Sequence, residues 1–560
     1  MSAQTGTTAP AGPVSRRIGD QAAFRWHKLL DEPNPLWIRE LRQSARLVRT
    51  PIILCVLSVL LTLAIAAVGG LVSMYESPAT TGYVIFQVFF SLMYFVVTFM
   101  GPGVAANSIA SEREGRTWEA VTLTGLRPAV IARGKFLAAY TAICMYIVML
   151  APVGALPFLF GGVTATETIV AFLFLFLIAG LAVAFGLAIS SKMASLRAAI
   201  VVTLICAFVA SLAAYWGLGY GLSFGAHELW SGVPDGPPVW LPSAYARAPF
   251  DLQYVLLLIV LPVALAVLPA WYLYEVTIAN LTSITDDRST GLKRWYLVCT
   301  PIFMVCAAVP AAIVAPSDRK GACVAGLSLM FLFLMFGVYL FIADSLGPSR
   351  RVVLHWDRLN VSRFGRFLGP GLIKTSMMQL VMTAATLTVP VLVGLIALPG
   401  GPGAGTNAVG IVMVAVYAAG FVLFSVGLGA FLRARSSAAM LPRVLLLAVH
   451  TFVAIGPWVV AAIAGIFASP AGREALVIAA PSPVYVFLAL DALDRGKEEL
   501  LVAGAFFTAV VWAMLGAMFL ALARMRARRI ITQHDAALAE TDRLLAEEDA
   551  RAATQAPVAV

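Results

Sequence analysis

The feature of this sequence that most constrains its fold is a series of about twelve apolar runs, each at least about 18 residues long. An α-helix rises about 1.5 Å per residue, so each run can cross a hydrocarbon core of about 30 Å. Hydrophobic residues make up 60% of the chain and charged residues only 12%, with a mean hydropathy of +0.89, which excludes an ordinary soluble enzyme. The sequence therefore predicts an all-α, polytopic helical membrane protein. The runs lie at 52–74, 83–105, 136–160, 168–190, 196–217, 252–274, 295–315, 322–343, 375–397, 409–431, 444–468 and 500–523.

The distribution of positive charge predicts the orientation. If the N-terminus is cytoplasmic, the great majority of the 39 Lys and Arg residues lie in inner segments, as the positive-inside bias requires. The net charge of +10 is then a topology signal, and nucleic acid is not an expected partner. We expect a multi-pass protein of the cytoplasmic (inner) membrane, in contact with its lipids and with both termini cytoplasmic. The loops 218–250 and 469–499 should face outward, which makes Ser482 accessible from outside.

The N-terminal 50 residues predict a disordered segment followed by an interfacial helix. Residues 1–33 are mostly small and polar, which favours disorder. Asn34 and Pro35 then form a helix start, with Asn34 as the cap. Arginines lie on one face of this helix and apolar residues on the other, so we expect the apolar face in the acyl boundary. A solvated amphipathic helix is the alternative. The predicted interfacial residues are Trp37, Arg39, Glu40 and Arg42.

Residue matches at a nearly constant shift predict an internal repeat. Each half would contain six spanning helices, with residues 34–290 forming the first half and 291–529 the second. Residues 530–560 would form a charged cytoplasmic tail. The matched pairs, at shifts of 238 to 241, are Arg127 and Arg366, Lys135 and Lys374, Pro152 and Pro390, Gly186 and Gly427, Lys192 and Arg433, Ser195 and Ser436, Tyr245 and Tyr485, and Asp251 and Asp491.

The most informative segment is the charged stretch between the second and third apolar runs. Ser111 can cap a helix whose early residues Glu112 and Glu114 suit the positive end of a helix dipole. Trp118, Val121 and Leu123 would give this helix an apolar side. A short charged helix presented at the inner face is one interpretation, and a solvated loop is the other.

This segment resembles the permease subunits of ABC transporters of the type-2 family. The matching residues are Ile109, Ala110, Glu112, Arg113, Glu114, Thr117, Glu119, Thr124, Leu126, Gly134 and Lys135, whereas Val121 stands where the family often has Leu. The resemblance implies a permease subunit of an ATP-driven exporter. It also implies that the segment is a coupling helix, which docks on a separate ATPase subunit through Glu112, Arg113, Glu114, Thr117 and Glu119.

The second half and the missing nucleotide motif complete this hypothesis. No G-x-x-x-x-G-K-[ST] motif occurs, so we expect no directly bound cofactor and no enzymatic activity of the chain itself, with ATP bound by the partner subunit. At a shift of 239, Glu112, Thr117 and Glu119 align with Arg351, Trp356 and Arg358. The second coupling segment is therefore expected to be a basic anchor, with a functional second site as the alternative.

Several other features leave further functions open. Gly221, Ser223 and Gly225 match the G-x-S-x-G motif of hydrolases, but they follow an apolar run where that motif needs a strand. The possible intramembrane polar sites are Gln87, Gln379 and His450. No buried relay of ionisable residues is apparent, which disfavours an ion-coupled carrier and favours a lipid-like or amphipathic substrate. A membrane scaffold that moves nothing is the main alternative. No metal site is expected from the scattered cysteines and histidines.

Overall fold

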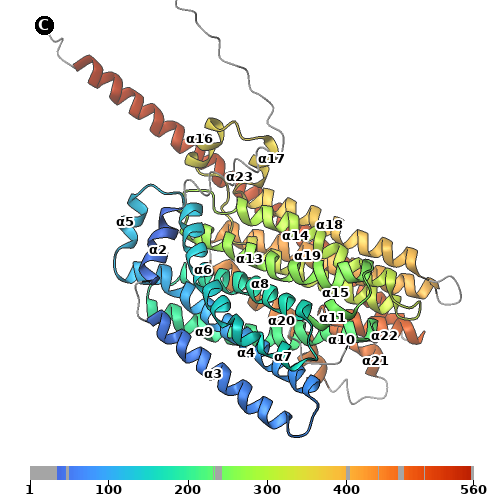
Figure 1. Cartoon of the computed structure of the whole chain (residues 1–560). Helices are drawn as coiled ribbons and strands as arrows, with labels where there is room; N and C mark the ends of the chain where they lie inside the picture. Colours follow the sequence, from blue (N-terminus) through green and yellow to red (C-terminus); the bar gives the residue numbers. More distant parts are fainter. Residues whose placement is uncertain are drawn as a thin grey trace, which may run out of the picture. The chain divides into compact units, whose positions relative to one another are not determined.

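The structure, a computed structural model, is predominantly helical in the part of the chain that it describes (Figure 1). Twelve of its helices are long and apolar enough to cross a membrane, and no strand occurs in the described residues. The prediction of an all-α polytopic membrane protein is confirmed. The predicted disordered segment 1–33 lies outside the described residues, which are 34–45, 49–230, 232–233, 242–398, 404–438, 440–464, 472–496 and 499–555.

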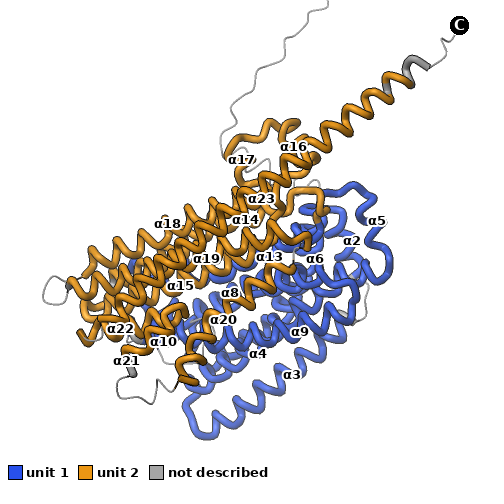
Figure 2. Tube along the Cα trace, turned by 180° about the vertical axis from the view of Figure 1, so that it is seen from behind, with its two compact units in different colours: residues 1–281 blue, residues 282–560 orange. Residues whose placement is uncertain are grey.

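The chain forms two compact units, residues 1–281 and 282–560 (Figure 2). Unit 1 contains the first six candidate spans, joined by short helices and two π-helical turns, η1 and η2. Its elements are α2 (Pro35–Ala45), α3 (Arg49–Val72), α4 (Pro78–Glu114), α5 (Trp118–Leu123), α6 (Pro128–Gly154), α7 (Leu156–Phe160), α8 (Ala165–Ser190), α9 (Leu196–Ala213), η1 (Ala214–Gly219), α10 (Tyr220–Leu229), α11 (Pro242–Arg247), α12 (Leu252–Tyr254), η2 (Val255–Val260) and α13 (Leu261–Leu281).

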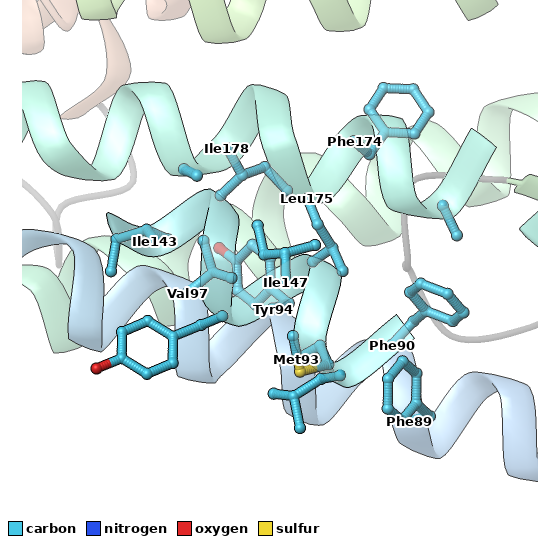
Figure 3. Packing of buried hydrophobic residues seen from close by; sticks show 14 of the residues in the cluster. Phe89, Phe90, Met93, Tyr94, Val97, Ile143, Ile147, Phe174, Leu175 and Ile178 are labelled. Atoms are coloured by element: carbon cyan, nitrogen blue, oxygen red, sulfur yellow. The ribbon is translucent and has the colours of Figure 1, made fainter. Parts of the chain in front are cut away.

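The core of unit 1 lies between α4, α6 and α8 (Figure 3). Phe89 and Phe90 of α4 are fully buried, and their rings meet edge to face with centroids 5.0 Å apart. Ile147 of α6 and Leu175 of α8 belong to the same cluster. On the other side of this core, Gly186 of α8 lies so close to α4 that a Cβ there would overlap the carbonyl oxygen of Pro102. Small residues thus allow close backbone approach between spanning helices.

The loop predicted at 218–250 is more helical than expected. The helix of the fifth span continues through η1 and α10 to Leu229. It ends there because Trp230 leaves the helical conformation and packs with Val233 and Leu258 in a small cluster. Gly221, Ser223 and Gly225 lie inside α10, directly after the π-helical turn η1. The strand that a nucleophile elbow requires before its serine is therefore replaced by helix.

Unit 2 contains the last six candidate spans. Its elements are α14 (Thr290–Ile313), α15 (Arg319–Phe341), α16 (Arg350–Arg358), α17 (Arg363–Leu368), α18 (Leu372–Ala397), α19 (Ala404–Arg435), α20 (Leu441–Ile463), α21 (Gly472–Ala475), η4 (Leu476–Ala479), α22 (Tyr485–Arg495) and α23 (Glu499–Gln555).

The central helix of unit 2 is α19, which packs against α15, α18 and α23. Its contact with α23 is close, because a Cβ at Gly427 would overlap the carbonyl oxygen of Gly516 and a Cβ at Gly420 would overlap that of Ala509. Gly186 and Gly427 are matched in the sequence, but they lie at contacts between different pairs of helices. Gly186 contacts the second span of unit 1, and Gly427 contacts the sixth span of unit 2. The internal repeat stays a prediction.

Helix α23 is a single helix of 57 residues. Both overall views show it continuing past the ends of the other helices of unit 2, with α16 and α17 beside it (Figures 1 and 2). The tail that the sequence places after residue 529 is therefore the uninterrupted continuation of the last span. Arg350 of α16 forms an ion pair of 2.8 Å with Asp542 in this continuation.

The loop that precedes α23 corrects one expectation about exposure. Ser482 is fully buried, and its hydroxyl donates a hydrogen bond of 2.8 Å to the carbonyl oxygen of Ala454. Tyr417 donates to the same turn, at the carbonyl oxygens of Ala480 and Ser482. The prediction of an accessible Ser482 is wrong, because the turn is held against unit 2 by these bonds. Val484, two residues later, is 55% exposed.

The close contact of Gly420 and Gly427 of α19 with the backbone of α23 predicts that a larger side chain there lowers stability. Gly427→Ala should lower the melting temperature of the purified chain, because the new methyl group must separate two helix backbones. Overpacking of this kind costs about 1–3 kcal/mol. Gly405→Ala, at an open position of the same helix, is the control. It should leave the melting temperature unchanged or raise it, and equal melting temperatures for the two variants would contradict this close contact.

Candidate functional site

The charged segment of unit 1 folds as the end of α4, a tight turn and the short helix α5. Ser111 lies inside α4, so the prediction that it caps a new helix is wrong. Its hydroxyl donates to the carbonyl oxygen of Asn107 one turn earlier, while the buried residues Ile109 and Ala110 extend the apolar face of α4. Glu112 and Glu114 consequently lie at the C-terminal end of a helix and not at an N-terminal end.

The turn after α4 has the form of a Schellman motif. Arg116 takes a left-handed conformation with φ of 56°, and the amide of Thr117 donates to the carbonyl oxygen of Glu112 at 2.9 Å. The amide of Arg116 donates to the carbonyl oxygen of Arg113. The Thr117 hydroxyl also donates to the carbonyl oxygen of Glu112, at 3.3 Å. These bonds set the direction in which α5 leaves α4.

Glu112 is the centre of a charge cluster that the sequence did not predict. Lys135 of α6 is fully buried, and its amino nitrogen lies 2.9 Å from Glu112 Oε2 and 3.2 Å from Glu40 Oε1. The same nitrogen donates to the carbonyl oxygen of Ser108 at 2.8 Å. Arg39 of α2 completes the cluster, 2.5 Å from Glu112 Oε1 and 3.1 Å from Glu40 Oε1. We call Arg39, Glu40, Glu112 and Lys135 the inner charge cluster.

The two carboxylates of this cluster favour the charged form of Arg39. Burial alone would lower the pKa of the Arg39 guanidinium, but hydrogen bonds to Glu112 and Glu40 outweigh burial and raise its pKa. Glu112 is only 12% exposed, whereas Arg39 is 47% exposed. The cluster is thus buried on the Lys135 side and open on the Arg39 side. It joins α2, α4 and α6 into one body.

Gly134 explains how α2 comes close enough to form this cluster. A Cβ at Gly134 would lie 2.7 Å from Asn34 Oδ1 and 2.9 Å from the Cβ of Leu36, so only glycine allows this approach. Asn34 caps α2 as predicted, accepting a hydrogen bond from the amide of Leu36 at 3.0 Å. Its amide group donates to the carbonyl oxygen of Val130. The Gly-Lys pair of the sequence pattern therefore has two local roles: Gly134 makes room and Lys135 supplies the charge.

The interfacial helix packs on protein more than expected. Leu36 is buried with Val121 and Ile131, and the Trp37 indole nitrogen donates to the Thr141 hydroxyl at 3.3 Å. Leu36 and Trp37 thus pack on neighbouring helices, and the expectation that the apolar face of α2 lies in the acyl boundary stays a prediction. Arg42 is exposed.

Two more of the predicted coupling residues are engaged within unit 1. Glu114 Oε2 accepts a hydrogen bond of 2.6 Å from the amide of Leu196, at the start of α9. Arg113 donates to the carbonyl oxygen of Met193 and lies over the Trp118 ring, 5.5 Å from its centroid. These side chains attach the segment to the start of α9 and to the turn before it.

What remains exposed is the outer face of α5. Leu123 is 86% exposed, and Glu119, Ala120 and Thr122 are exposed beside it. Val121, on the opposite face, is buried. The candidate functional site is therefore the outer face of α5, an apolar residue flanked by one carboxylate, supported from behind by the inner charge cluster. Of the five predicted coupling residues, Glu114, Thr117 and Glu119 are exposed. Glu114 is bonded to the amide of Leu196 and the Thr117 hydroxyl to the carbonyl oxygen of Glu112, so Glu119 is the carboxylate on the outer face of α5 itself.

Unit 2 carries the same backbone arrangement at its own charged segment. Helix α16 ends at Arg358, Asn360 follows with φ of 47°, and the amide of Val361 donates to the carbonyl oxygen of Trp356 at 3.0 Å. The six-residue helix α17 follows, as α5 follows Arg116. Arg116 and Asn360 are the two non-glycine residues of positive φ in the described chain. The expectation that this segment is only a basic stretch is incomplete, because it folds as an ordered helix-turn-helix.

The predicted intramembrane polar residues are not brought together. Gln87 is half-buried in unit 1. Gln379 of unit 2 is buried and donates to the carbonyl oxygen of Gly337 at 2.8 Å. His450 lies between Tyr339 and Ser425, with ring nitrogens 2.6 and 3.0 Å from their hydroxyl oxygens. The Ser425 hydroxyl also donates to the carbonyl oxygen of Phe421, and His450 thus joins α15, α19 and α20.

Buried ionisable residues are nevertheless more frequent than the sequence suggests. They form separate groups near helix ends, including Lys135 with Glu112, Glu167 with Arg247 at 3.8 Å, and Lys293 with Asp344. The signal that was missed is the position of Lys135, Lys293 and Asp344 at the very ends of apolar runs. Comparison with protein-family models, curated proteins and solved structures finds no match to this chain.

The inner charge cluster predicts the effect of removing its buried cation. Lys135→Met should lower the melting temperature, because it leaves Glu112 Oε2 partly buried without its buried cationic partner. Breaking a buried pair in this way costs about 3–5 kcal/mol. The double variant Lys135→Met with Glu112→Leu should recover part of the loss. Glu119→Ala, on the exposed face, is the control and should melt as the wild type does. If all three variants melt alike, the cluster is not a structural centre.

Proposed function

We propose that this protein is the membrane-spanning permease subunit of an ATP-driven exporter that works with separate ATPase subunits. The observation that supports this most is the outer face of α5, where Leu123 is 86% exposed on a short helix whose base is fixed by buried ion pairs. Docking surfaces place apolar anchors among polar neighbours, and α5 presents Leu123 in this way beside Glu119, outside the spans. The sequence resemblance to type-2 ABC permeases names the partner as an ATPase.

The proposed mechanism is a rigid-body displacement of helices, driven by the ATPase subunits. ATP bound by the partner would draw ATPase subunits together, and each would displace the permease element that it holds. The inner charge cluster joins α2, α4 and α6, so a displacement of α5 would move these helices as one rigid body. Glu112, Arg113 and Glu114 would then act as internal braces, and Glu119 and Leu123 as the docking contacts. The chain itself would carry out no chemistry on ATP.

The proposed substrate class is lipid-like or amphipathic. The charged groups named above lie near helix ends, and the helix centres are strongly apolar, which suits an apolar cargo better than a small ion. An ion-coupled carrier is less favoured, because Asp344 and Glu112 are already neutralised by lysines of the chain. A scaffold without transport remains the main alternative. Stimulation of ATP hydrolysis by an added lipid substrate would distinguish an exporter from a scaffold.

The proposed orientation in the cytoplasmic membrane predicts a labelling pattern. Phe250→Cys and Val484→Cys should each react with an impermeant thiol reagent in intact cells, because both positions are exposed in the loops assigned to the outside. Glu119→Cys should react only after the membrane is made permeable. Labelling of Glu119→Cys in intact cells, without labelling of the other two, would invert the orientation.

The docking surface predicts the effect of a charge placed on α5. Leu123→Asp should reduce co-purification of the co-expressed ATPase subunit by at least about tenfold, since a buried leucine contributes about 1.5–3 kcal/mol to such a contact. The melting temperature of the permease should not change, because Leu123 contacts little of its own unit. Leu545→Asp, at a 53% exposed leucine on α23, is the matched control and should co-purify normally. Unchanged co-purification of Leu123→Asp would remove the main support for docking at α5.

A further inference from the structure

Unit 2 contains a buried ion pair for which the proposed function has so far no role. Lys293 lies one turn inside α14 and is 1% exposed, and Asp344 follows α15 and is 5% exposed. Their side chains are 2.7 Å apart. Neither residue belongs to the charged segment 349–368 or to the intramembrane polar residues predicted from the sequence.

The two side chains meet at the linker that joins α17 to α18. Lys293 donates to the carbonyl oxygen of Gly369 at 2.7 Å, and Asp344 Oδ2 accepts from the amide of Gly371 at 3.4 Å. The Thr375 hydroxyl, in the first turn of α18, donates to the same carboxylate oxygen at 2.6 Å. The pair therefore holds the linker that follows the charged segment at Gly369 and Gly371, and the first turn of α18 at Thr375.

The backbone of Asp344 is held as well. Its carbonyl oxygen accepts a hydrogen bond of 3.0 Å from Arg433 at the end of α19, and Oδ1 accepts from the amide of Ser345. Asp344 thus connects α14, α18 and α19 through one residue. A carboxylate with this many charge-assisted and backbone bonds is a rigid node, because a shift of any one neighbour breaks several bonds.

Both units therefore hold their charged segment with a buried lysine, but from opposite ends. In unit 1, Lys135 holds the end of α4, before α5, through Glu112 and the carbonyl oxygen of Ser108. In unit 2, Lys293 and Asp344 hold the end of α17, before α18. At the other end of the unit 2 segment the ion pairs, Arg351 with Asp286 and Arg350 with Asp542, are exposed, and the Ser349 hydroxyl donates to the carbonyl oxygen of Thr285. Exposed pairs of this kind contribute little to stability.

We propose that Asp344 and Lys293 are positioning residues that fix the α16–α17 segment of unit 2 in the geometry needed to contact a partner protein. This inference rests on the proposed function for its biological meaning, but the positioning itself is a property of the chain alone. The segment is an ordered element whose orientation is set by the Asp344 node. Its exposed residues, Leu354, Arg358 and Leu359, would face a partner surface that is apolar and acidic.

The test is hydrogen exchange of the full chain in lipid nanodiscs without any partner. The main variant is Lys293→Met with Asp344→Leu, since replacing a buried pair by apolar residues of similar volume is often neutral for overall stability. Amides of residues 350–371 should exchange at least roughly tenfold faster than in the wild type, because the linker loses its fixed acceptors and donors. The melting temperature and the exchange of α5 in unit 1 should stay unchanged. Thr375→Val should give a smaller acceleration in the same residues.

Arg350→Ala is the matched control, because it removes an exposed pair from the same segment and should leave exchange unchanged. Unaltered protection of residues 350–371 in the double variant would overturn the positioning role. Acceleration spread equally over α14, α15 and α19 would also overturn it, because the pair would then hold the bundle and not the segment. Failure of the wild-type chain to bind an ATPase would count against the proposed function and not against this result.

Discussion

The placement of the charged segment in each unit depends on the cost of withdrawing a lysine amino group from water. An ammonium group loses several kcal/mol of hydration on burial unless acceptors surround it. Lys135 receives two carboxylates and a carbonyl oxygen, and Lys293 receives one carboxylate and a carbonyl oxygen. These acceptors come from helices that are distant in sequence, so satisfying each amino group forces those helices together. The placement of the charged segments follows from this requirement.

Backbone geometry then determines what the charged segments can present. Gly134 permits the close approach of α2 to α6, and Arg116 and Asn360 accept a left-handed conformation that reverses the chain after α4 and α16. A non-glycine residue in this conformation carries a small energetic cost, which the surrounding hydrogen bonds must offset. The short helices α5 and α17 leave their turns in fixed directions. In unit 1 the same turn therefore places one face of α5, with Val121, against the protein and leaves the other face, with Leu123, exposed.

The sequence predicted the spans and the start of α2 well, because apolar periodicity and an Asn-Pro cap are local signals. It predicted the direction of the charged side chains poorly. Glu112 was expected to face a partner, yet its ligands Arg39 and Lys135 come from other helices, with Arg39 separated from it by 73 positions. Asp344 was missed although it directly follows an apolar run, because its partner Lys293 and the linker glycine are 51 and 27 positions away. Only a fold brings such residues together, so a linear pattern can indicate that charges occur but not which pairs they form.

The length of α23 has a geometric consequence for the last span. The part of this helix beyond Arg524 measures about 46 Å at 1.5 Å per residue. Because no proline or turn interrupts α23 within its 57 residues, a change in the tilt of the span changes the direction of the whole helix. A change in tilt of about 10°, well inside the range that spanning helices adopt, would move its tip by about 8 Å. A small change in side-chain packing around the span would thus displace the C-terminal end of α23 by about 8 Å, which is close to the distance between the axes of two packed helices.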